Sequence, residues 1–416
     1  MPPPAVENDQ LSLGSIQVLN AHTGGWSSVS LGTEFVGGVA EMSVPFFSQA
    51  RTFERLWPEM SARIAEVFDN GKFSHGKQVG ELEAALADYT GARRVVGVNS
   101  GTDALVLLLR ALGLRPGDEV VVPAYSFIAT ASAVVLAGGT PVFADVDRDT
   151  YALDPDEVAR VATPRTRFVM PAHLFCRMAD MAALGEVARD LGLTVVEDSA
   201  EAIGMRQGGV HAGLHGAGGV LSFFPAKTLG ALGDAGAVLT DDDRVADLVA
   251  GLRHHGRFGR TLDDFPTIST ETGMTGTNSK MDDIQAAILL TKLAHLDDDI
   301  ARRAELAERY RRGLDGVVRL PVPGDEPVFY VHLIEVELRD ELAGHLAERG
   351  IGTETYYPVP LHLQPCFAEL GHRRGDFPRA ESASRRALAL PLHADLTDEQ
   401  VDRVCATIRE FYAGRP

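Results

Sequence analysis

The stretch RVVGVNSGTDALVLLLRAL, residues 94 to 112, changes from one regular structure to another within a few positions. Its β-branched start, Val95–Val98, predicts a buried strand, and the apolar run that follows predicts a helix from about Thr102 to Leu112. The polar turn Asn99-Ser100-Gly101-Thr102 joins the two, so its amides and hydroxyls would lie at the N-terminus of the helix, where an anion is favoured. An ordinary N-cap, in which a hydroxyl satisfies the free amides, also explains the turn.

The same alternation of strands and helices continues along the chain. Short β-branched or apolar runs predict further strands at Glu119–Pro123, Pro141–Val146, Phe168–Ala172, Thr194–Glu197, Val220–Phe224 and Ala235–Thr240. Apolar residues at helical spacing predict helices between the earlier strands, at Ile128–Ala137, Pro155–Ala162 and Asp180–Leu191. Strands that alternate with helices imply right-handed crossovers, so we expect an α/β fold with a mostly parallel sheet covered by helices.

The chain as a whole predicts three parts. Residues 1–45 are rich in Gly, Ser and small polar residues with little periodicity, so we expect an N-terminal arm or disordered extension and predict no particular helix or strand there. Residues 46–310 form the predicted large domain, and residues 311–416 a smaller C-terminal α/β domain. Helical patterns add elements at Leu56–Phe68, Gln78–Tyr89, Met281–Leu296, Asp299–Leu314, Asp340–Arg349 and Asp398–Tyr412, and Tyr330–Leu338 predicts a strand.

The composition argues against several classes of protein. The 416-residue chain carries 39 Lys and Arg against 58 Asp and Glu, a net charge of −19, so it would repel nucleic acid and anionic membranes. Its first residues lack the features of a signal peptide, and no run of about 18 apolar residues follows, so we expect a cytoplasmic protein. The distant cysteines Cys176, Cys366 and Cys405 fit reduced thiols, and no histidine spacing resembles a metal site, so we expect no bound metal.

Two charged residues lie at the ends of predicted strands. Asp198 ends the run Leu193–Asp198, at an edge where open α/β sheets bind ligands, although a capping or salt-bridge role is equally open. Lys227 follows the strand Val220–Phe224, and its ammonium would be costly to bury unpaired. If both strands belong to one sheet, one cleft receives the amine, the carboxylate and the anion-binding turn. Pyridoxal phosphate requires these groups: an amine for a Schiff base, a carboxylate for the pyridinium nitrogen and a helix terminus for the phosphate.

Five stretches of the sequence carry a resemblance to a known family. NSGTDAL, PGDEVVVPAYSFIATASAV, VEDSAEAIG, LSFFPAKTLGALGDAGAV and YYPVPLHLQP resemble the DegT-type (DegT/StrS) sugar aminotransferases, which use pyridoxal 5′-phosphate. The similarity runs from about Pro45 to Phe411, with the motifs in the family's order. It implies the fold-type-I architecture of these enzymes, in which a smaller C-terminal domain follows a large cofactor-binding domain.

The resemblance also implies roles for the residues that bind the cofactor. Lys227 would form the Schiff base and later move a proton between the donor's α-carbon and C4′ of the cofactor, which passes through pyridoxamine phosphate. Asp198 would pair with the pyridinium nitrogen and keep the ring an electron sink. The positions that match phosphate-binding residues of the family are Gly101, Thr102 and Ser222.

Further matches concern the cofactor ring and the neighbouring subunit. Phe127 matches the aromatic residue that stacks on the ring, although a Phe before an apolar helix is usually a core residue. The segment Gly276–Met281 resembles one that the neighbouring subunit inserts into the site. Asn278 and Lys280 would then contact the phosphate in trans, within a homodimer.

The sequence departs from the family pattern at two places near the expected site. Family members commonly have Gln three residues after the pyridinium-binding Asp, facing the cofactor's O3′ hydroxyl, and often His two positions later; here these positions hold Glu201 and Ile203. A second carboxylate close to Asp198 must be protonated or compensated. The segment Phe175–Met178 also replaces a stretch that usually reads aromatic, Gly, Gln or His, Pro, so this loop differs in shape.

Several aromatic and imidazole side chains match segments that border the sugar-nucleotide site of relatives. For each histidine, structural hydrogen bonding or a surface position is an alternative explanation. The residues expected to bind substrate on this resemblance are His255, His332, Tyr356, Tyr357 and His362.

Together these inferences predict a homodimeric aminotransferase that moves the amino group of L-glutamate to a keto sugar nucleotide. The favoured substrate is a dTDP-4-keto-6-deoxyhexose aminated at C4, in deoxysugar biosynthesis for an antibiotic or another secondary metabolite. Amination at C3 of a dTDP-3-keto-6-deoxyhexose, and amination of a ketocyclitol, stay open. A nicotinamide oxidoreductase would need a GxGxxG turn, which does not follow Val95–Val98, and a non-catalytic regulator could keep the same fold.

Overall fold

The computed structural model describes residues 15–19, 26–30, 43–74, 76–257, 272–320 and 322–413. The chain divides into two compact units, Met1–Ser43 and Val44–Pro416. In the first unit, strands β1 (Ser15–Leu19) and β2 (Trp26–Ser30) pair antiparallel. The sequence predicted no particular element in the N-terminal arm, so these two strands were missed. The other residues from 1 to 42 lie outside the described residues.

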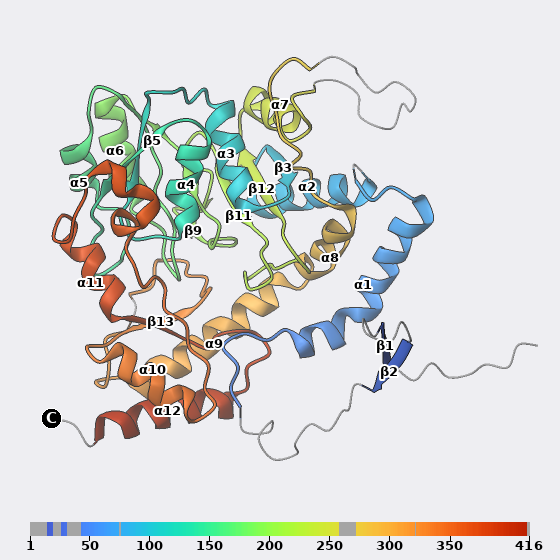
Figure 1. Cartoon of the computed structure of the whole chain (residues 1–416), viewed down its shortest axis with the longest axis vertical. Helices are drawn as coiled ribbons and strands as arrows, with labels where there is room; N and C mark the ends of the chain where they lie inside the picture. Colours follow the sequence, from blue (N-terminus) through green and yellow to red (C-terminus); the bar gives the residue numbers. More distant parts are fainter. Residues whose placement is uncertain are drawn as a thin grey trace, which may run out of the picture. The chain divides into compact units, whose positions relative to one another are not determined.

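The second unit is built on a central sheet (Figure 1). Its strands are β3 (Arg94–Val98), β4 (Glu119–Pro123), β5 (Thr140–Ala144), β6 (Thr166–Val169), β7 (Thr194–Val195), β8 (Glu197–Asp198), β11 (Gly219–Ser222) and β12 (Gly236–Thr240). They form ladders in the orders β3-β12-β11-β8 and β5-β4-β6-β7, which meet where Ala172 forms a parallel bridge to Asp198. β12 pairs antiparallel with both its neighbours and the other ladder pairs are parallel, which confirms the predicted mostly parallel sheet.

Alternate side chains of the strands pack into cores on opposite faces of the sheet. In β3, Val96 lies in a core with α3 (Gly101–Ala111) and α7 (Asp243–Leu252), whereas Val95 lies in a core with α2 (Lys77–Thr90) and α8 (Asp283–Leu293). Successive side chains of a strand point to opposite faces, and both faces are covered here. The near-continuous apolar runs of the sequence follow from this double burial.

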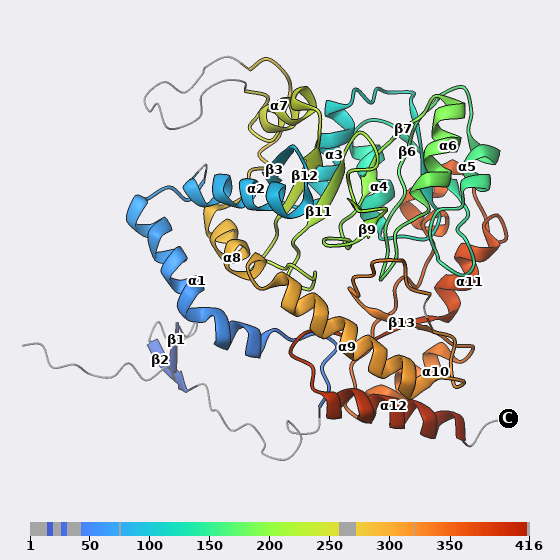
Figure 2. The same ribbon diagram turned by 180° about the vertical axis from the view of Figure 1, so that it is seen from behind.

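Further helices complete the layers around the sheet. Leu56 and Met60 of α1 (Ala50–Asn70) pack on Ile288 of α8, so these two helices lie side by side, as both views show (Figures 1 and 2). The sequence predicted α1, α2 and α8 but missed α7. The remaining elements of this part are α4 (Ile128–Leu136), α5 (Pro155–Val161), α6 (Met181–Leu191), β9 (Arg206–Gln207) and β10 (Val210–His211).

The C-terminal segment forms a core of its own within the second unit. Apolar residues between Leu306 and Phe411 gather there, together with Val44 from the start of the unit. The division into domains at residue 310 stays a prediction, because residues 44–416 group as one compact unit. The elements are α9 (Leu296–Leu314), β13 (His332–Glu335), α10 (Arg339–Ala347), the 3-10 helices η3 (Leu361–Leu363) and η4 (Pro365–Leu370), α11 (Pro378–Arg386), β14 (Ala387–Leu390) and α12 (Asp398–Ala413).

Two features of the C-terminal segment were not predicted from the sequence. α11 buries Ala380 and Ala383, which are too small to produce a clear hydrophobic period. β14 pairs antiparallel with β13, with His332 opposite Leu390. Among the described helices, none is both long enough and apolar enough to cross a membrane.

Candidate active site

A cavity of about 380 Å³ lies where β3, β8 and β11 end. These three strands run in the same direction, so the residues that follow them meet at one edge of the sheet. The cavity brings together most of the residues predicted to bind cofactor or substrate, namely Gly101, Thr102, Phe127, Asp198, Glu201, Ser222, Lys227, Tyr356 and Tyr357.

Lys227 has two enclosing partners in this cavity. Its Nζ donates to Glu201 Oε1 at 3.2 Å and lies 4.2 Å from the centre of the Tyr330 ring. The Lys227 side chain is 14% exposed and that of Glu201 is 4% exposed. A carboxylate and the negative face of an aromatic ring both stabilise an ammonium that has lost most of its water. The structure thus gives the Lys227 ammonium a partner within its own chain, which the sequence had not predicted.

Asp198 lies at the end of β8 and is 7% exposed. Its Oδ2 accepts a hydrogen bond of 2.6 Å from Thr130 Oγ1, and its Oδ1 accepts one of 3.3 Å from the Ala200 amide. Burial raises the pKa of Asp198, and these two hydrogen bonds together with the Lys227 charge oppose the rise. A protonated ring nitrogen in the cavity would supply the cation that this buried carboxylate lacks within ion-pair distance among the described residues.

The N-terminus of α3 forms another wall of the cavity. Ser100 caps the helix by accepting a hydrogen bond of 3.1 Å from the Asp103 amide, so the ordinary N-cap explanation holds for this serine. At Gly101 an added Cβ would lie 2.8 Å from Ser222 Cβ, closer than real Cβ atoms approach. Glycine therefore allows the close contact that brings the Ser222 hydroxyl to the helix terminus, where hydroxyls and free amides suit a phosphate.

Aromatic rings make up the opposite side. Phe127 is 52% exposed and its ring centre lies 6.0 Å from that of Tyr357, so it lines the cavity instead of joining the core. Tyr125 is buried beneath them, and its hydroxyl donates to the Tyr356 carbonyl. Flat apolar surfaces of this kind suit a planar ligand ring.

Several lining residues were missed from the sequence. The ring of His173 has both nitrogens engaged: Ala179 N donates to Nδ1 at 3.2 Å, so Nε2 carries the proton and donates to Glu197 Oε2 at 2.9 Å. Burial would raise the pKa of Glu197, yet His173 and backbone amides hold it below its ordinary value. His173 directly follows the predicted strand Phe168–Ala172, and that position was an available signal; Tyr330 comes from a distant segment and had none.

Two predicted substrate residues lie elsewhere. His332 is 2% exposed and stacks on Tyr310 at 4.7 Å between ring centres, and burial lowers its pKa to about 3. His362 is 1% exposed and its Nε2 lies 3.2 Å from Glu381 Oε1. Neither histidine is among the residues that line the Lys227 cavity, so their contact with the substrate stays a prediction.

Three other predicted residues gather on a separate surface. Asn278 and His255 are exposed, and the Lys280 ammonium donates to Asn278 Oδ1. Burial lowers the pKa of Lys280, and the nearby charges of Arg253 and Arg257 add to this effect. These residues do not line their own chain's cavity. No group of three or more His, Cys, Asp or Glu in the described part of the chain is arranged to hold a metal ion.

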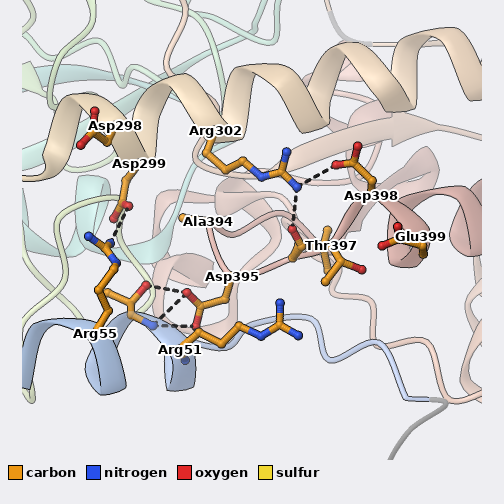
Figure 3. A pocket seen from close by; sticks show the side chains of 12 residues that line it. Arg51, Arg55, Asp298, Asp299, Arg302, Ala394, Asp395, Thr397, Asp398 and Glu399 are labelled. Carbon is orange, nitrogen blue, oxygen red and sulfur yellow. Dashed lines mark hydrogen bonds and ion pairs between the residues drawn. The ribbon is translucent and has the colours of Figure 1, made fainter.

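A second cavity, of about 600 Å³, lies beside the N-terminus of α1 (Figure 3). Asp395 accepts hydrogen bonds from the Arg51 and Thr52 amides at 2.8 and 3.1 Å, so it caps the first turn of α1. Arg302 donates to Asp398 at 2.7 Å across the same cavity. Asp395, Arg302 and Asp398 thus have structural partners in this cavity.

Comparison with known proteins identifies the family. The profile of the DegT/DnrJ/EryC1/StrS aminotransferase family matches residues 55–409. The chain is 43% identical to a dTDP-3-amino-3,4,6-trideoxy-alpha-D-glucose transaminase of Streptomyces venezuelae, over 88% of this chain and 96% of that protein. It is 40% identical to a pleiotropic regulatory protein of Geobacillus stearothermophilus, over 89% of this chain and 99% of that protein. The crystal structure of S. venezuelae DesV in complex with a ketimine intermediate superposes with a TM-score of 0.85 at 42% identity, covering 90% of this chain and 99% of that chain.

The chain belongs to the DegT/DnrJ/EryC1/StrS aminotransferase family. It is an aminotransferase with the fold of the enzymes that use pyridoxal phosphate, and pyridoxal phosphate is the cofactor of this family. The cavity fits that group: it offers an enclosed amine at Lys227, a buried carboxylate at Asp198 and a glycine-lined helix terminus at Gly101.

Proposed function

We propose that this chain transfers the amino group of L-glutamate to the ketone of a nucleotide-activated sugar, as a homodimer. The observation that carries the proposal is the meeting of the Lys227 amine, the Asp198 carboxylate and the α3 terminus in one enclosed cavity. The substrate class is supported by the activity named for the S. venezuelae transaminase, to which the chain is 43% identical.

In this proposal the side chains that line the cavity have different roles. Pyridoxal phosphate supplies an aldehyde that condenses with amines and a ring that accepts an electron pair. Lys227 Nζ holds the cofactor and carries the proton that moves during amino transfer, and Asp198 keeps a proton on the ring nitrogen. Gly101, Thr102 and Ser222 bind the phosphate, and Phe127 covers one face of the ring.

The position of amination is the finer part of the proposal. The sequence favoured C4 of a dTDP-4-keto-6-deoxyhexose, whereas the S. venezuelae relative is named for a 3-amino sugar. No residue of the cavity distinguishes the two positions. We therefore propose both the 3-keto and the 4-keto sugar as candidate substrates, and test the 3-keto sugar first.

The second subunit is proposed to complete the site. Asn278, Lys280 and His255 form a polar, cationic surface outside their own chain's cavity, near the charge of Arg257. A surface of this charge suits the phosphate of the cofactor or of a nucleotide. In a homodimer it would face the partner's cavity, which explains why predicted phosphate contacts lie apart from Lys227.

The test is incubation of the purified full chain, with its cofactor, with glutamate and a panel of 3-keto and 4-keto sugar nucleotides and an inosose. We expect glutamate to change the visible absorbance and one sugar nucleotide to gain an amine, whose carbon is assigned by mass spectrometry and NMR. If only the inosose were aminated, the substrate would be a ketocyclitol and not a sugar nucleotide. A spectrum that does not respond to glutamate would favour the non-catalytic regulator.

A further inference from the structure

Glu201, which departs from the family pattern, contacts the reactive lysine. Its Oε1 accepts from Lys227 Nζ at 3.2 Å and from the Tyr357 hydroxyl at 3.1 Å, and its Oε2 accepts from the Phe175 amide at 3.1 Å. The residue is 5% exposed. Phe175 begins the other segment that departs from the pattern, Phe175–Met178, so the two departures meet in one contact.

In each hydrogen bond that the Glu201 carboxylate makes with a described residue, the carboxylate is the acceptor. An ionised carboxylate accepts on both oxygens, whereas an amide accepts on one oxygen and donates from its nitrogen. Glutamine at this position would therefore leave either the Phe175 amide or the Lys227 side without an acceptor. Burial, and then the Glu201 charge, raise the pKa of Tyr357 well above its ordinary value, so its hydroxyl stays a donor. These contacts fit the charged form of Glu201.

Other titratable groups around Lys227 have different partners. Asp198 is held by Thr130 and Ala200, and His173 by Glu197 and Ala179. Within the part of the chain that the structure describes, no carboxylate besides Glu201 lies within ion-pair distance of Nζ. The remaining groups that face the cavity near Lys227 are Asp234, Tyr330, Tyr356 and Tyr357.

We infer that Glu201 is the ionised partner that holds a proton on Lys227, both in the free chain and when the chain holds its cofactor. The inference rests on the proposed function, and it differs from the role read off the family pattern, in which this position faces O3′ of the cofactor. An anion at about 3 Å that is shielded from water favours the charged form of the amine that it faces.

The first test is a pH titration of the visible absorbance of the cofactor-loaded chain. In Glu201→Gln we expect the midpoint to fall by about one pH unit or more, since the anion is removed and the shape is kept. The matched control is Tyr357→Phe, which removes another contact of the same oxygen and keeps the charge, so its midpoint should not fall. An unchanged or higher midpoint in Glu201→Gln would overturn the inference and leave the proposed function intact.

The second test needs no cofactor. The sequence holds five lysines, at positions 72, 77, 227, 280 and 292, so carbon-13 reductive methylation gives few NMR signals, and the Lys227→Ala variant assigns one of them. We expect the Lys227 signal to titrate at lower pH in Glu201→Gln than in the parent chain. Equal midpoints of the Lys227 signal in Glu201→Gln and in the parent chain would refute the pairing. A chain that binds no cofactor would refute the proposed function, and this second outcome is independent of the first.

A conservative variant keeps the inference testable if Glu201→Gln does not fold. Glu201→Asp keeps the charge and withdraws it by one methylene, so the midpoint of this variant should lie below that of the parent chain. A midpoint in Glu201→Asp that equals that of the parent in both titrations would contradict the pairing.

Discussion

The Lys227 cavity and the cavity beside α1 both contain ion pairs, but they differ in how far water reaches them. In the cavity beside α1, the Arg302 and Asp398 side chains are 32% and 43% exposed. In the Lys227 cavity the paired side chains are 14% and 4% exposed and lie against the Tyr330 ring. Exposed pairs are screened and stabilise little, whereas enclosed charges change one another's proton affinity. Enclosure, and not the number of charges, distinguishes the cavity that we propose as the active site.

The largest expected effect is that of Lys227→Ala. Without the amine, the proton that amino transfer requires has no carrier, so the rate should fall by about 10³-fold or more while the fold is kept. The measurement is turnover with glutamate, with circular dichroism as the check on folding. Lys77→Ala, at an exposed lysine paired with Glu81, is the control and should retain activity. Near-normal turnover of Lys227→Ala would refute the proposal that this cavity is the active site.

Asp198→Asn should have the next largest effect. It keeps the shape and removes the buried charge that stabilises a protonated ring nitrogen, so turnover should fall by about 10²-fold or more. Asp395→Asn makes the same exchange in the other cavity and should alter turnover by less than about threefold. If turnover fell equally in Asp198→Asn and Asp395→Asn, the two cavities would not differ in their contribution to the reaction.

Lys292 of α8 joins the two regions, and its removal should have a smaller effect. Its buried Nζ donates to Gly230 O, three residues after Lys227, at 2.5 Å, and to Gln49 Oε1, at the start of α1, at 3.0 Å. Lys292→Met leaves both acceptors without their donor, which should cost about 1–3 kcal/mol of unfolding free energy. Urea unfolding measures this, with Lys72→Met at an exposed lysine as the control. If Lys292→Met lowered the free energy of unfolding no more than the control, the Lys292 hydrogen bonds to Gly230 and Gln49 would not stabilise the fold.

The pH dependence of stability supplies a second measurement on Lys292. Burial lowers its pKa from 10.5 to about 8, so the folded state binds fewer protons than the unfolded state between these values. The free energy of unfolding should therefore rise with pH across this window, by about 2 kcal/mol between pH 7 and 10. The rise should be smaller in Lys292→Met, and an identical pH profile would contradict the burial of a charged amine.

The smallest expected effect is that of Asp395→Ala. It removes the cap that a distant residue places on α1, so the unfolding free energy should fall by about 1 kcal/mol. Asp398→Ala, which breaks only ion pairs with Arg302 and Arg309, should cost less. Thermal unfolding of both variants ranks them, and a larger loss in Asp398→Ala would reverse our account of this cavity.

The meeting of Lys227, Asp198 and Gly101 in one cavity could be predicted, because their positions depend on local pattern and on a general property of parallel sheets. Lys227, Asp198 and Gly101 each follow a short apolar run, and parallel strands bring such positions to one edge. His332 could not be placed in this way, because its burial against Tyr310 depends on how α9 packs on β13. α7 and α11 were missed as well, and α11 buries alanines that leave little hydrophobic period.

By itself the sequence determined the α/β class, the strand ends that carry the amine and the carboxylate, and the family whose motifs they match. Only the tertiary structure decided which group each of these charges meets. The partner of Lys227 proved to be Glu201, which the motif had assigned to the cofactor, and Tyr330 joined them from about 100 residues further along the chain. Local periodicity records which face of an element is buried, whereas the pairing of two buried side chains depends on packing between distant segments.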